Sequence, residues 1–245
     1  MSLSGQVILI TGSSQGIGEA AALRLASEGA SLVINYFSNA DGAQALVEQI
    51  GSERAVAVKA DASKLSDLDH LVDAAVAKFG KIDVVVPNAG LLLMRDVEST
   101  TEEDFDQTYN LMVKGPYFLV QKAVKHMPPG GRIIFLSSSV TAFSGILPPY
   151  LLYASAKGAI EQMTRLMAKD LARKGITVNT VAPGPTATEL FFKGKSEQVL
   201  KACAAFSPFN RIGEPDEIVG AMAFLCGKDS RWVSGQIIRV NGGMA

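Results

Sequence analysis

The sequence predicts one α/β domain, residues 1–245, in which a doubly wound parallel sheet of about seven strands carries helices on both faces. Short apolar runs alternate with segments of helical length, and such runs are typical of strands buried on both faces of a parallel sheet. No linker, low-complexity tract or internal repeat divides the chain, so a single domain is the simplest organisation. The expected strands are Val7–Ile10, Leu32–Ile34, Ala55–Val58, Ile82–Val86, Ile133–Leu136, Ile176–Val181 and Ile237–Val240.

Composition excludes several classes of function. The 23 basic and 24 acidic residues give a net charge of -1, and no basic run of the kind that binds nucleic acid is present. Cys203 and Cys226 are too few for a disulfide framework and lack a metal-binding spacing. His70 and His126 stand apart from thiols and carboxylate clusters, so we expect no metal site. With no export signal and no apolar stretch of about 18 residues, we expect a cytoplasmic protein without a membrane segment.

A glycine-rich segment, Thr11–Gly18, lies between the first expected strand and a helical pattern that begins near Ile17. Gly12, Gly16 and Gly18 allow a tight turn and a close approach to a pyrophosphate, which would face the amides at the start of the helix. Their spacing is GxxxGxG and not GxGxxG, so an ordinary strand-to-helix turn is the alternative interpretation of this segment.

The second strand is expected to end at Asn35, where a dinucleotide site meets the adenosine ribose. An acidic residue there would bind a 2′-hydroxyl and repel a 2′-phosphate, whereas Asn35 is neutral. Ser38 and Asn39 offer hydrogen bonds to a phosphate, although Gln15 is neutral and no Lys or Arg lies between positions 35 and 40. The segment therefore favours NADP(H), and its alternative is a surface turn.

Two polar segments follow the third and fourth expected strands. Asp61 comes after the third, and Asn88-Ala89-Gly90 comes after the fourth. Open α/β sheets bind ligands at the carboxyl ends of their strands, so we expect Asp61 to accept a hydrogen bond from an adenine amino group. A helix cap for Asp61 and a simple turn at Gly90 are the alternatives.

The fifth strand runs into three serines, Ser137 to Ser139, which are followed downstream by Tyr153 and Lys157 on a helical segment. Residues four apart share one helix face, so the phenol and the ammonium are neighbours. A nearby ammonium favours the phenolate and would lower the tyrosine pKa from about 10, making it usable as a general acid or base. Such a pair also occurs as ordinary helix surface, and the serines as ordinary loop.

Three further segments are predicted from local signals. Thr100 and Glu103 form a capping box that starts a helix, and Pro215 starts another. Two prolines close the sixth strand, and residues 189–211 then form a long connection. This connection suggests an apolar ligand, or else part of the core or of a subunit contact. The aromatic residues on it are Phe191, Phe192, Phe206 and Phe209.

These motifs occur in one order and together resemble the short-chain dehydrogenase/reductase family over essentially the whole chain. The resemblance implies a Rossmann-like domain, a nicotinamide cofactor and a homotetramer. The segment from Asn35 to Asn39 resembles NADP-preferring members that reduce ketones, including the polyhydroxynaphthalene reductases. We therefore expect an NADPH-dependent oxidoreductase that reversibly reduces a ketone or aldehyde on a small to medium apolar substrate.

The resemblance also implies residue roles. Tyr153 would be the general acid, Lys157 would lower its pKa and hold the nicotinamide ribose, and Ser138 would hydrogen-bond the substrate oxygen, with Ser139 as the alternative. The residues implied at the cofactor are Gly12, Ser14, Gly16, Ile17, Gly18, Asn35, Tyr36, Ser38, Asp61, Ala62, Asn88, Ala89, Gly90, Tyr153, Lys157, Pro183, Gly184, Thr186 and Thr188.

One position departs from the family pattern. Relatives usually carry an Asn seven residues after the Phe of a Phe-Asp pair, and counting from Phe105 reaches Met112. Asn110 is two residues early, about 200° around an α-helix, so it is not expected to face the same way. A thioether is a weak acceptor and no donor, so the proton supply through Lys157 is altered. The alternative function is thus a cofactor-binding protein with little redox turnover or altered chemistry.

Overall fold

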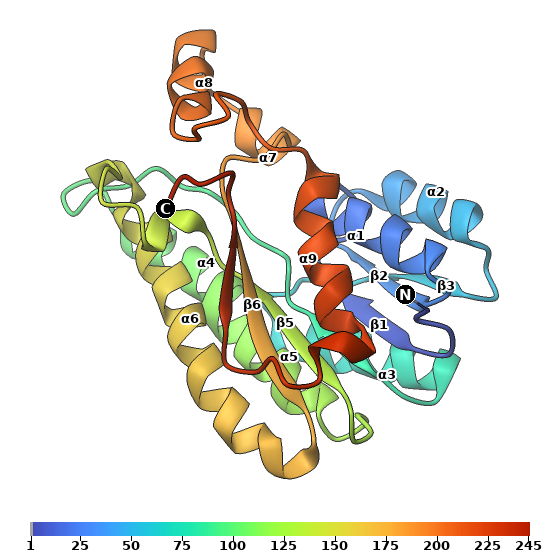
Figure 1. The fold of residues 1–245 in the computed structure, drawn as a ribbon. Coiled ribbons are helices and arrows are strands. Elements are labelled where there is room, and N and C mark those ends of the chain that lie inside the picture. The colour runs from blue at the N-terminus through green and yellow to red at the C-terminus, as the bar shows by residue number, and fades with distance from the viewer. Residues whose placement is uncertain (1) are drawn as a thin grey trace.

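The computed structural model describes residues 2–245 and contains one sheet of seven strands in the order β3-β2-β1-β4-β5-β6-β7. Every pair of neighbouring strands is parallel, which confirms the predicted fold class (Figure 1). The strand order reverses between β1 and β4, where ligands bind in doubly wound sheets. The strands are β1 (Val7–Ile10), β2 (Ser31–Tyr36), β3 (Ala55–Lys59), β4 (Val84–Val86), β5 (Arg132–Leu136), β6 (Thr177–Pro183) and β7 (Ile237–Val240).

Helices cover both faces of the sheet. They are α1 (Gly16–Ser27), α2 (Ala40–Ile50), α3 (Leu65–Phe79), α4 (Glu102–Tyr109), α5 (Gly115–Ala123), α6 (Leu151–Leu171), α7 (Glu189–Phe192), α8 (Glu197–Ala204) and α9 (Pro215–Cys226). A π-helical turn, Asn110–Lys114, joins α4 to α5. Short 3₁₀ turns are Ser139–Thr141, Pro148–Tyr150, Ala172–Lys174 and Lys228–Ser230.

The core has a part on each face of the sheet, because successive side chains of a strand point to opposite faces. In β1, Ile8 and Ile10 pack with α1, α2 and α9, whereas Val7 and Leu9 pack on the opposite face with α3 and α5. The β5 and β6 part of that second face is covered by α6. Because both faces are apolar, the polar side chains that follow the strands are concentrated at the carboxyl edge of the sheet.

Three predicted boundaries need correction. The cap of α4 is Thr101, whose side chain accepts a hydrogen bond from Asp104 N, while Thr100 donates to the Asp96 carbonyl instead. The segment 189–211 is not a plain loop, since it contains α7 and α8, which lie beyond the carboxyl edge in Figure 1. Strand β6 continues through Pro183, beyond the predicted end at Val181.

Candidate active site

A cavity of about 700 Å³ lies at the carboxyl edge of the sheet and brings together most of the predicted site residues. Two predicted residues lie outside its lining: Gly18 lies in the first turn of α1, and Tyr36 packs against the apolar core. The predicted residues that line it are Gly12, Ser14, Gly16, Ile17, Asn35, Ser38, Asp61, Ala62, Asn88, Ala89, Gly90, Ser138, Tyr153, Lys157, Pro183, Gly184, Thr186 and Thr188.

The glycine loop needs each of its three predicted glycines. Gly12 and Gly16 have φ values of +60° and +62°, in the left-handed region that side chains disfavour. A Cβ at Gly18 would lie 2.5 Å from the Gly12 carbonyl oxygen. The Gln15 side chain makes no capping hydrogen bond to another described residue, so the first amides of α1 are available to an anion. This cradle fits a pyrophosphate.

Asn88 joins the loop after β4 to the glycine loop. Its Nδ2 donates to the carbonyl oxygens of Thr11 and Gly12, at 2.9 and 3.0 Å. The backbone N–H groups of Asn88 and Ala89 in turn donate to Thr11 Oγ1. The side chain of Asn88 therefore holds the backbone on the two sides of the β1–β4 switch point.

Asn35 lines the cavity and also holds the same loop from the other side. Strand β2 continues to Tyr36, so Asn35 lies inside the strand and is only 2% exposed. Its Oδ1 accepts from Gly12 N at 3.0 Å, and its Nδ2 donates to the Ala60 carbonyl at 2.9 Å. The amide of Asn35 thus fixes the glycine loop against the end of β3.

The wall beyond β2 is formed by Phe37, Ser38 and Asn39. Asn39 is also engaged within the protein, because its Nδ2 donates to the Ser14 carbonyl and its Oδ1 accepts from Gly42 N at the start of α2. It is therefore a helix cap as well as a residue of the cavity wall. Ser38 keeps its place as a polar side chain at this wall.

Asp61 lines the cavity and also caps the following turn. Ser63 donates to Asp61 Oδ1 through its backbone N–H and its hydroxyl, and Lys64 Nζ lies 3.5 Å from Oδ2. Burial raises the pKa of this carboxyl, but the Ser63 hydrogen bonds and the Lys64 charge outweigh it and hold the pKa below its usual value. Both interpretations of Asp61, capping and cavity contact, are compatible with this geometry.

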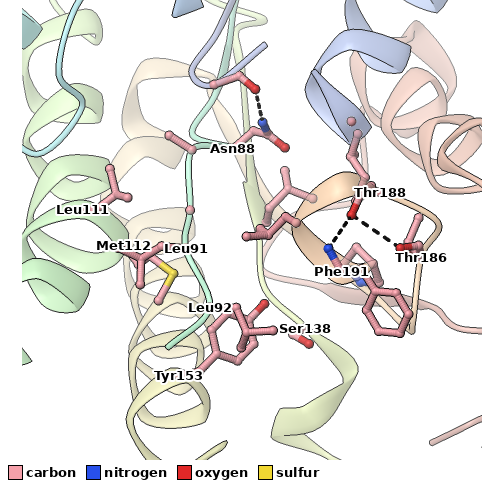
Figure 2. A pocket seen from close by; sticks show the side chains of 18 of the residues that line it. Asn88, Leu91, Leu92, Leu111, Met112, Ser138, Tyr153, Thr186, Thr188 and Phe191 are labelled. Atoms are coloured by element: carbon pink, nitrogen blue, oxygen red, sulfur yellow. Dashed lines mark hydrogen bonds between the residues drawn. The ribbon is translucent and has the colours of Figure 1, made fainter. Parts of the chain in front are cut away.

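The three serines after β5 have three different environments. Ser137 Oγ donates to Glu161 Oε1 at 3.0 Å, and Ser139 Oγ donates to the Ala182 carbonyl at 3.1 Å. Ser138 is the serine whose side chain lies beside the Tyr153 phenol in Figure 2, and its hydroxyl lowers the pKa of Tyr153. The geometry thus favours Ser138 over Ser139 at the cavity.

Tyr153 and Lys157 lie on one face of α6, as predicted, with Lys157 Nζ 5.7 Å from the centre of the phenol ring. Lys157 is buried, and its Nζ donates to the Leu136 carbonyl at 2.7 Å. Burial lowers the pKa of Lys157 to about 8. Burial also raises the pKa of Tyr153 to about 12, while the Ser138 hydrogen bond lowers it and Tyr150 raises it.

The expected depression of the Tyr153 pKa is therefore wrong for the protein alone, because desolvation of the phenolate outweighs the effect of the Ser138 hydroxyl. The phenol is protonated near neutral pH. That is the form a proton donor requires.

Met112 lies in the π-helical turn, is 1% exposed and lines the cavity. Its sulfur would be 3.6 Å from a Cβ built at Gly90. Asn110 lines the same cavity, contrary to the expectation that it faces away. That expectation used α-helical geometry, whereas this segment is a π-turn, a feature common at functional sites.

The far end of the cavity is apolar and was largely missed from the sequence. Phe191 and Phe206 line it, whereas Phe192 and Phe209 are exposed outside it. Thr188 Oγ1 accepts from Phe191 N at 3.2 Å and so fixes the start of α7 (Figure 2). In the sequence, only the aromatic residues of segment 189–211 indicated an apolar ligand here. Other lining residues without such a signal are Leu91, Leu92, Val140, Ile146, Tyr150, Cys203 and Met244.

Among residues 2–245, no helix is long and apolar enough to cross a membrane. The same residues contain no group of His, Cys, Asp and Glu side chains arranged to hold a metal ion.

The fold and this cavity define a dinucleotide-binding α/β protein. A family model described as "Enoyl-(Acyl carrier protein) reductase" matches residues 12–245. The chain is 42% identical over 256 residues to the hydroxynaphthalene reductase-like protein Arp2 of Metarhizium anisopliae, covering 99% of this chain and 96% of the relative. The chain belongs to the short-chain dehydrogenase/reductase family of oxidoreductases.

Solved structures agree with this assignment. A short-chain dehydrogenase from Burkholderia cenocepacia in complex with NADP has a TM-score of 0.94 at 32% identity, covering 100% of this chain and 99% of that chain. The angucycline C-6 ketoreductase LanV with bound NADP has a TM-score of 0.92 at 36% identity, covering 99% of this chain and 96% of that chain.

Proposed function

We propose that this protein is an NADPH-dependent reductase of a ketone or aldehyde carried by a small to medium apolar molecule, acting reversibly on the corresponding alcohol. The observation that carries the proposal is the arrangement of Ser138, Tyr153 and Lys157 in a cavity that runs from the glycine loop to an apolar wall. A hydroxyl pair beside a buried ammonium is suited to proton transfer at an oxygen atom.

When bound, the reduced nicotinamide supplies a hydride, with its electron pair, to the carbonyl carbon and becomes oxidised. Tyr153 donates its phenolic proton to the carbonyl oxygen, so the carbonyl gains the two hydrogens of the alcohol. Val140 N donates to Ser138 Oγ, at 3.5 Å, which leaves the Ser138 hydroxyl proton to stabilise the developing charge on that oxygen. The Lys157 ammonium, buried beside the phenol, favours the phenolate that remains.

Two features support the cofactor assignment. The glycine cradle and the free first turn of α1 suit the pyrophosphate of a dinucleotide, with Asp61 and Asn88 along the cleft. The wall beyond β2 carries the neutral side chains of Ser38 and Asn39 and no acidic residue that would repel a 2′-phosphate. Two similar solved structures contain NADP. These observations favour NADPH over NADH.

The apolar wall supports the substrate class. Its aromatic and aliphatic side chains offer contact area and few hydrogen bonds, so it selects a substrate by shape around one polar oxygen. The similar protein LanV is named a ketoreductase, and Arp2 is named hydroxynaphthalene reductase-like.

A homotetramer in the cytoplasm completes the proposal. Phe105, Tyr117 and Leu166 leave large apolar side chains exposed on α4, α5 and α6, where a second copy could cover them. Light scattering at micromolar concentration should give the tetramer mass, and a monomer would contradict this part. Cys203 and Cys226 are both free thiols, in keeping with a reducing compartment.

A second candidate rests on Met112. Counting from Phe105, the family pattern implies an amide at this position, where this chain has a buried thioether, so the protein could bind the cofactor with little redox turnover or with altered chemistry. This candidate predicts tight NADPH binding without consumption by carbonyl compounds.

The loss of absorbance at the reduced nicotinamide band, followed with a panel of aliphatic and aromatic carbonyl compounds, separates the two candidates. The reductase consumes NADPH with at least one member of the panel and leaves it intact without a carbonyl. Binding without consumption across the whole panel would favour the second candidate.

A further inference from the structure

Glu161 is a buried carboxylate one helical turn beyond Lys157, and it is 7% exposed. Two hydroxyls reach the same carboxylate oxygen, Oε1: Ser137 Oγ at 3.0 Å and Thr141 Oγ1 at 2.5 Å. The other oxygen lies 3.9 Å from the Arg165 guanidinium, at the edge of ion-pair range. A carboxylate is costly to bury unless it is hydrogen-bonded, so these two hydroxyls are its main compensation.

The two hydroxyls come from the segment that carries Ser138. Ser137 precedes Ser138, and Thr141 lies three residues after it, with Oγ1 also 2.8 Å from the Ser138 carbonyl oxygen. Glu161 therefore holds this segment on both sides of Ser138. By contrast, Ser138 Oγ itself accepts a long hydrogen bond from Val140 N, at 3.5 Å, within this segment.

The same helix face carries the other two groups of the site. Tyr153, Lys157 and Glu161 are spaced four residues apart, so they follow one another along α6. The distance between the Ser138 hydroxyl and the Tyr153 phenol consequently depends on how the serine segment is fixed to α6. Glu161 provides that fixed point through side-chain hydrogen bonds.

We propose that Glu161 is a positioning residue for the reaction: it clamps Ser137 and Thr141 to α6 and thereby sets Ser138 against Tyr153. This inference rests on the proposed function, in which the hydroxyls of Ser138 and Tyr153 act on the substrate oxygen. Glu161 itself touches neither substrate nor cofactor in this account.

Three variants test the clamp. Glu161→Leu removes both acceptor bonds and should lower kcat roughly 10- to 100-fold, the effect of a small misplacement of catalytic groups, while the Kd of NADPH changes less than about twofold. Glu161→Gln keeps an oxygen that both hydroxyls reach and should retain kcat within about fivefold of wild type. Arg165→Ala is the control, since it removes only the distant cation and should leave kcat unchanged.

The decisive experiment is a double-mutant cycle with Ser138→Ala. If Glu161 acts through Ser138, adding Glu161→Leu to Ser138→Ala should lower kcat by less than about threefold, because the positioned group is already gone. If the two losses multiply, Glu161 supports the site in general and the inference is wrong. Melting temperatures of all four proteins show whether each is folded.

Ser137→Ala covers the case in which Glu161→Leu does not fold. It removes one of the two donors and should lower kcat about three- to tenfold with unchanged NADPH Kd, and an unchanged kcat would overturn the clamp.

If wild type reduces no carbonyl compound at all, the proposed function fails, and the inference falls with it. If wild type is active and the cycle is multiplicative, only the inference fails.

Discussion

The two ends of the cavity are held together in different ways. At the cofactor end, buried amides fix the loops: Asn35 binds Gly12 N and the Ala60 carbonyl, and Asn88 binds two carbonyls of the glycine loop. At the substrate end, most of the wall is made of aromatic and aliphatic side chains, and its hydrogen bonds are local ones such as that from Phe191 N to Thr188 Oγ1. Directional bonds specify one ligand geometry, whereas apolar packing tolerates many.

The two kinds of packing imply two kinds of specificity. The cofactor end recognises a constant molecule and is built from residues whose exchange disturbs the loop itself. In the proposed function the substrate end selects by shape, so exchanging its residues should alter which substrate is accepted without disturbing the fold. The same cavity contains Ser138, Tyr153 and Lys157, to which the proposed function assigns the chemistry.

The largest effect is expected from Tyr153→Phe, which removes the proton donor and little volume. We expect kcat to fall by roughly 10²–10⁴-fold, the usual worth of general acid catalysis. The Kd of NADPH should stay within about twofold, since the hydroxyl is not needed to hold the glycine loop. Fluorescence titration with NADPH and steady-state turnover check the two values, and near-normal turnover would mean that another group is the acid.

The next effect separates two neighbouring serines. Ser138→Ala should lower kcat by roughly 10²–10³-fold, as for the loss of one donor to a developing oxyanion. Ser139→Ala is the matched control: it loses bonds to the Ala182 carbonyl and to Asn241, so it should lower the melting temperature while keeping most of kcat. If Ser139→Ala is the more damaging to kcat, the assignment of the two serines is reversed.

At the cofactor end, Asn35→Asp should weaken NADPH and NADH alike, by roughly tenfold, because the buried amide loses its donor to the Ala60 carbonyl. The ratio of the two Kd values should stay close to that of wild type. Ser38→Asp, at the exposed wall, should instead move the ratio toward NADH by repelling the 2′-phosphate. A change of preference in Asn35→Asp alone would restore Asn35 as the discriminating residue.

The pH dependence of stability tests the burial of Lys157, whose pKa is lowered to about 8 from 10.5. Between these values the unfolded chain holds more proton than the folded one, so the burial penalty is full below about pH 8 and fades as pH rises toward about 10.5. The unfolding free energy of wild type, minus that of Lys157→Met, should thus rise by up to about 3 kcal/mol across this window. Urea denaturation without cofactor measures it, and a flat difference would contradict the buried ammonium.

The smallest effect is expected from Met112→Asn. If proton delivery contributes to the rate-limiting step, an amide at this position should raise kcat by less than about tenfold, with a larger solvent isotope effect in wild type. The melting temperature should fall, because an amide would replace a fully buried thioether. Met94→Asn, at an exposed methionine, is the control. An unchanged or lower kcat in a folded Met112→Asn protein would show that this position does not limit turnover.

The sheet and the motif order could be predicted because apolar runs and glycine spacing are local signals. All seven strands lie where the sequence predicts them, within a few residues. The orientation of single polar side chains could not be predicted. The hydrogen bonds from Asn35 to Gly12 N and the Ala60 carbonyl depend on the placement of the segments after β1 and β3, which the residues around Asn35 do not reveal.

Long-range packing explains the remaining differences. Burial, which depends on the whole fold, raises the pKa of Tyr153, although the local Lys157 spacing suggested the opposite. The π-turn brings Asn110 and Met112 to the same cavity, whereas an α-helical count separates them. Met244, near the chain end, lines the substrate wall with no sequence signal at all.

The central claim is that hydride reaches a carbonyl carbon while Tyr153 supplies the proton. A single-turnover reaction with NADPH deuterated at the transferred position, using the best carbonyl compound of the panel, tests it most directly by mass spectrometry of the product. We predict one deuterium on the carbinol carbon with wild type and, in the same time, at least a hundredfold less labelled alcohol with Tyr153→Phe. Cofactor oxidation without deuterium in the alcohol, or equal labelling by Tyr153→Phe, would contradict the account.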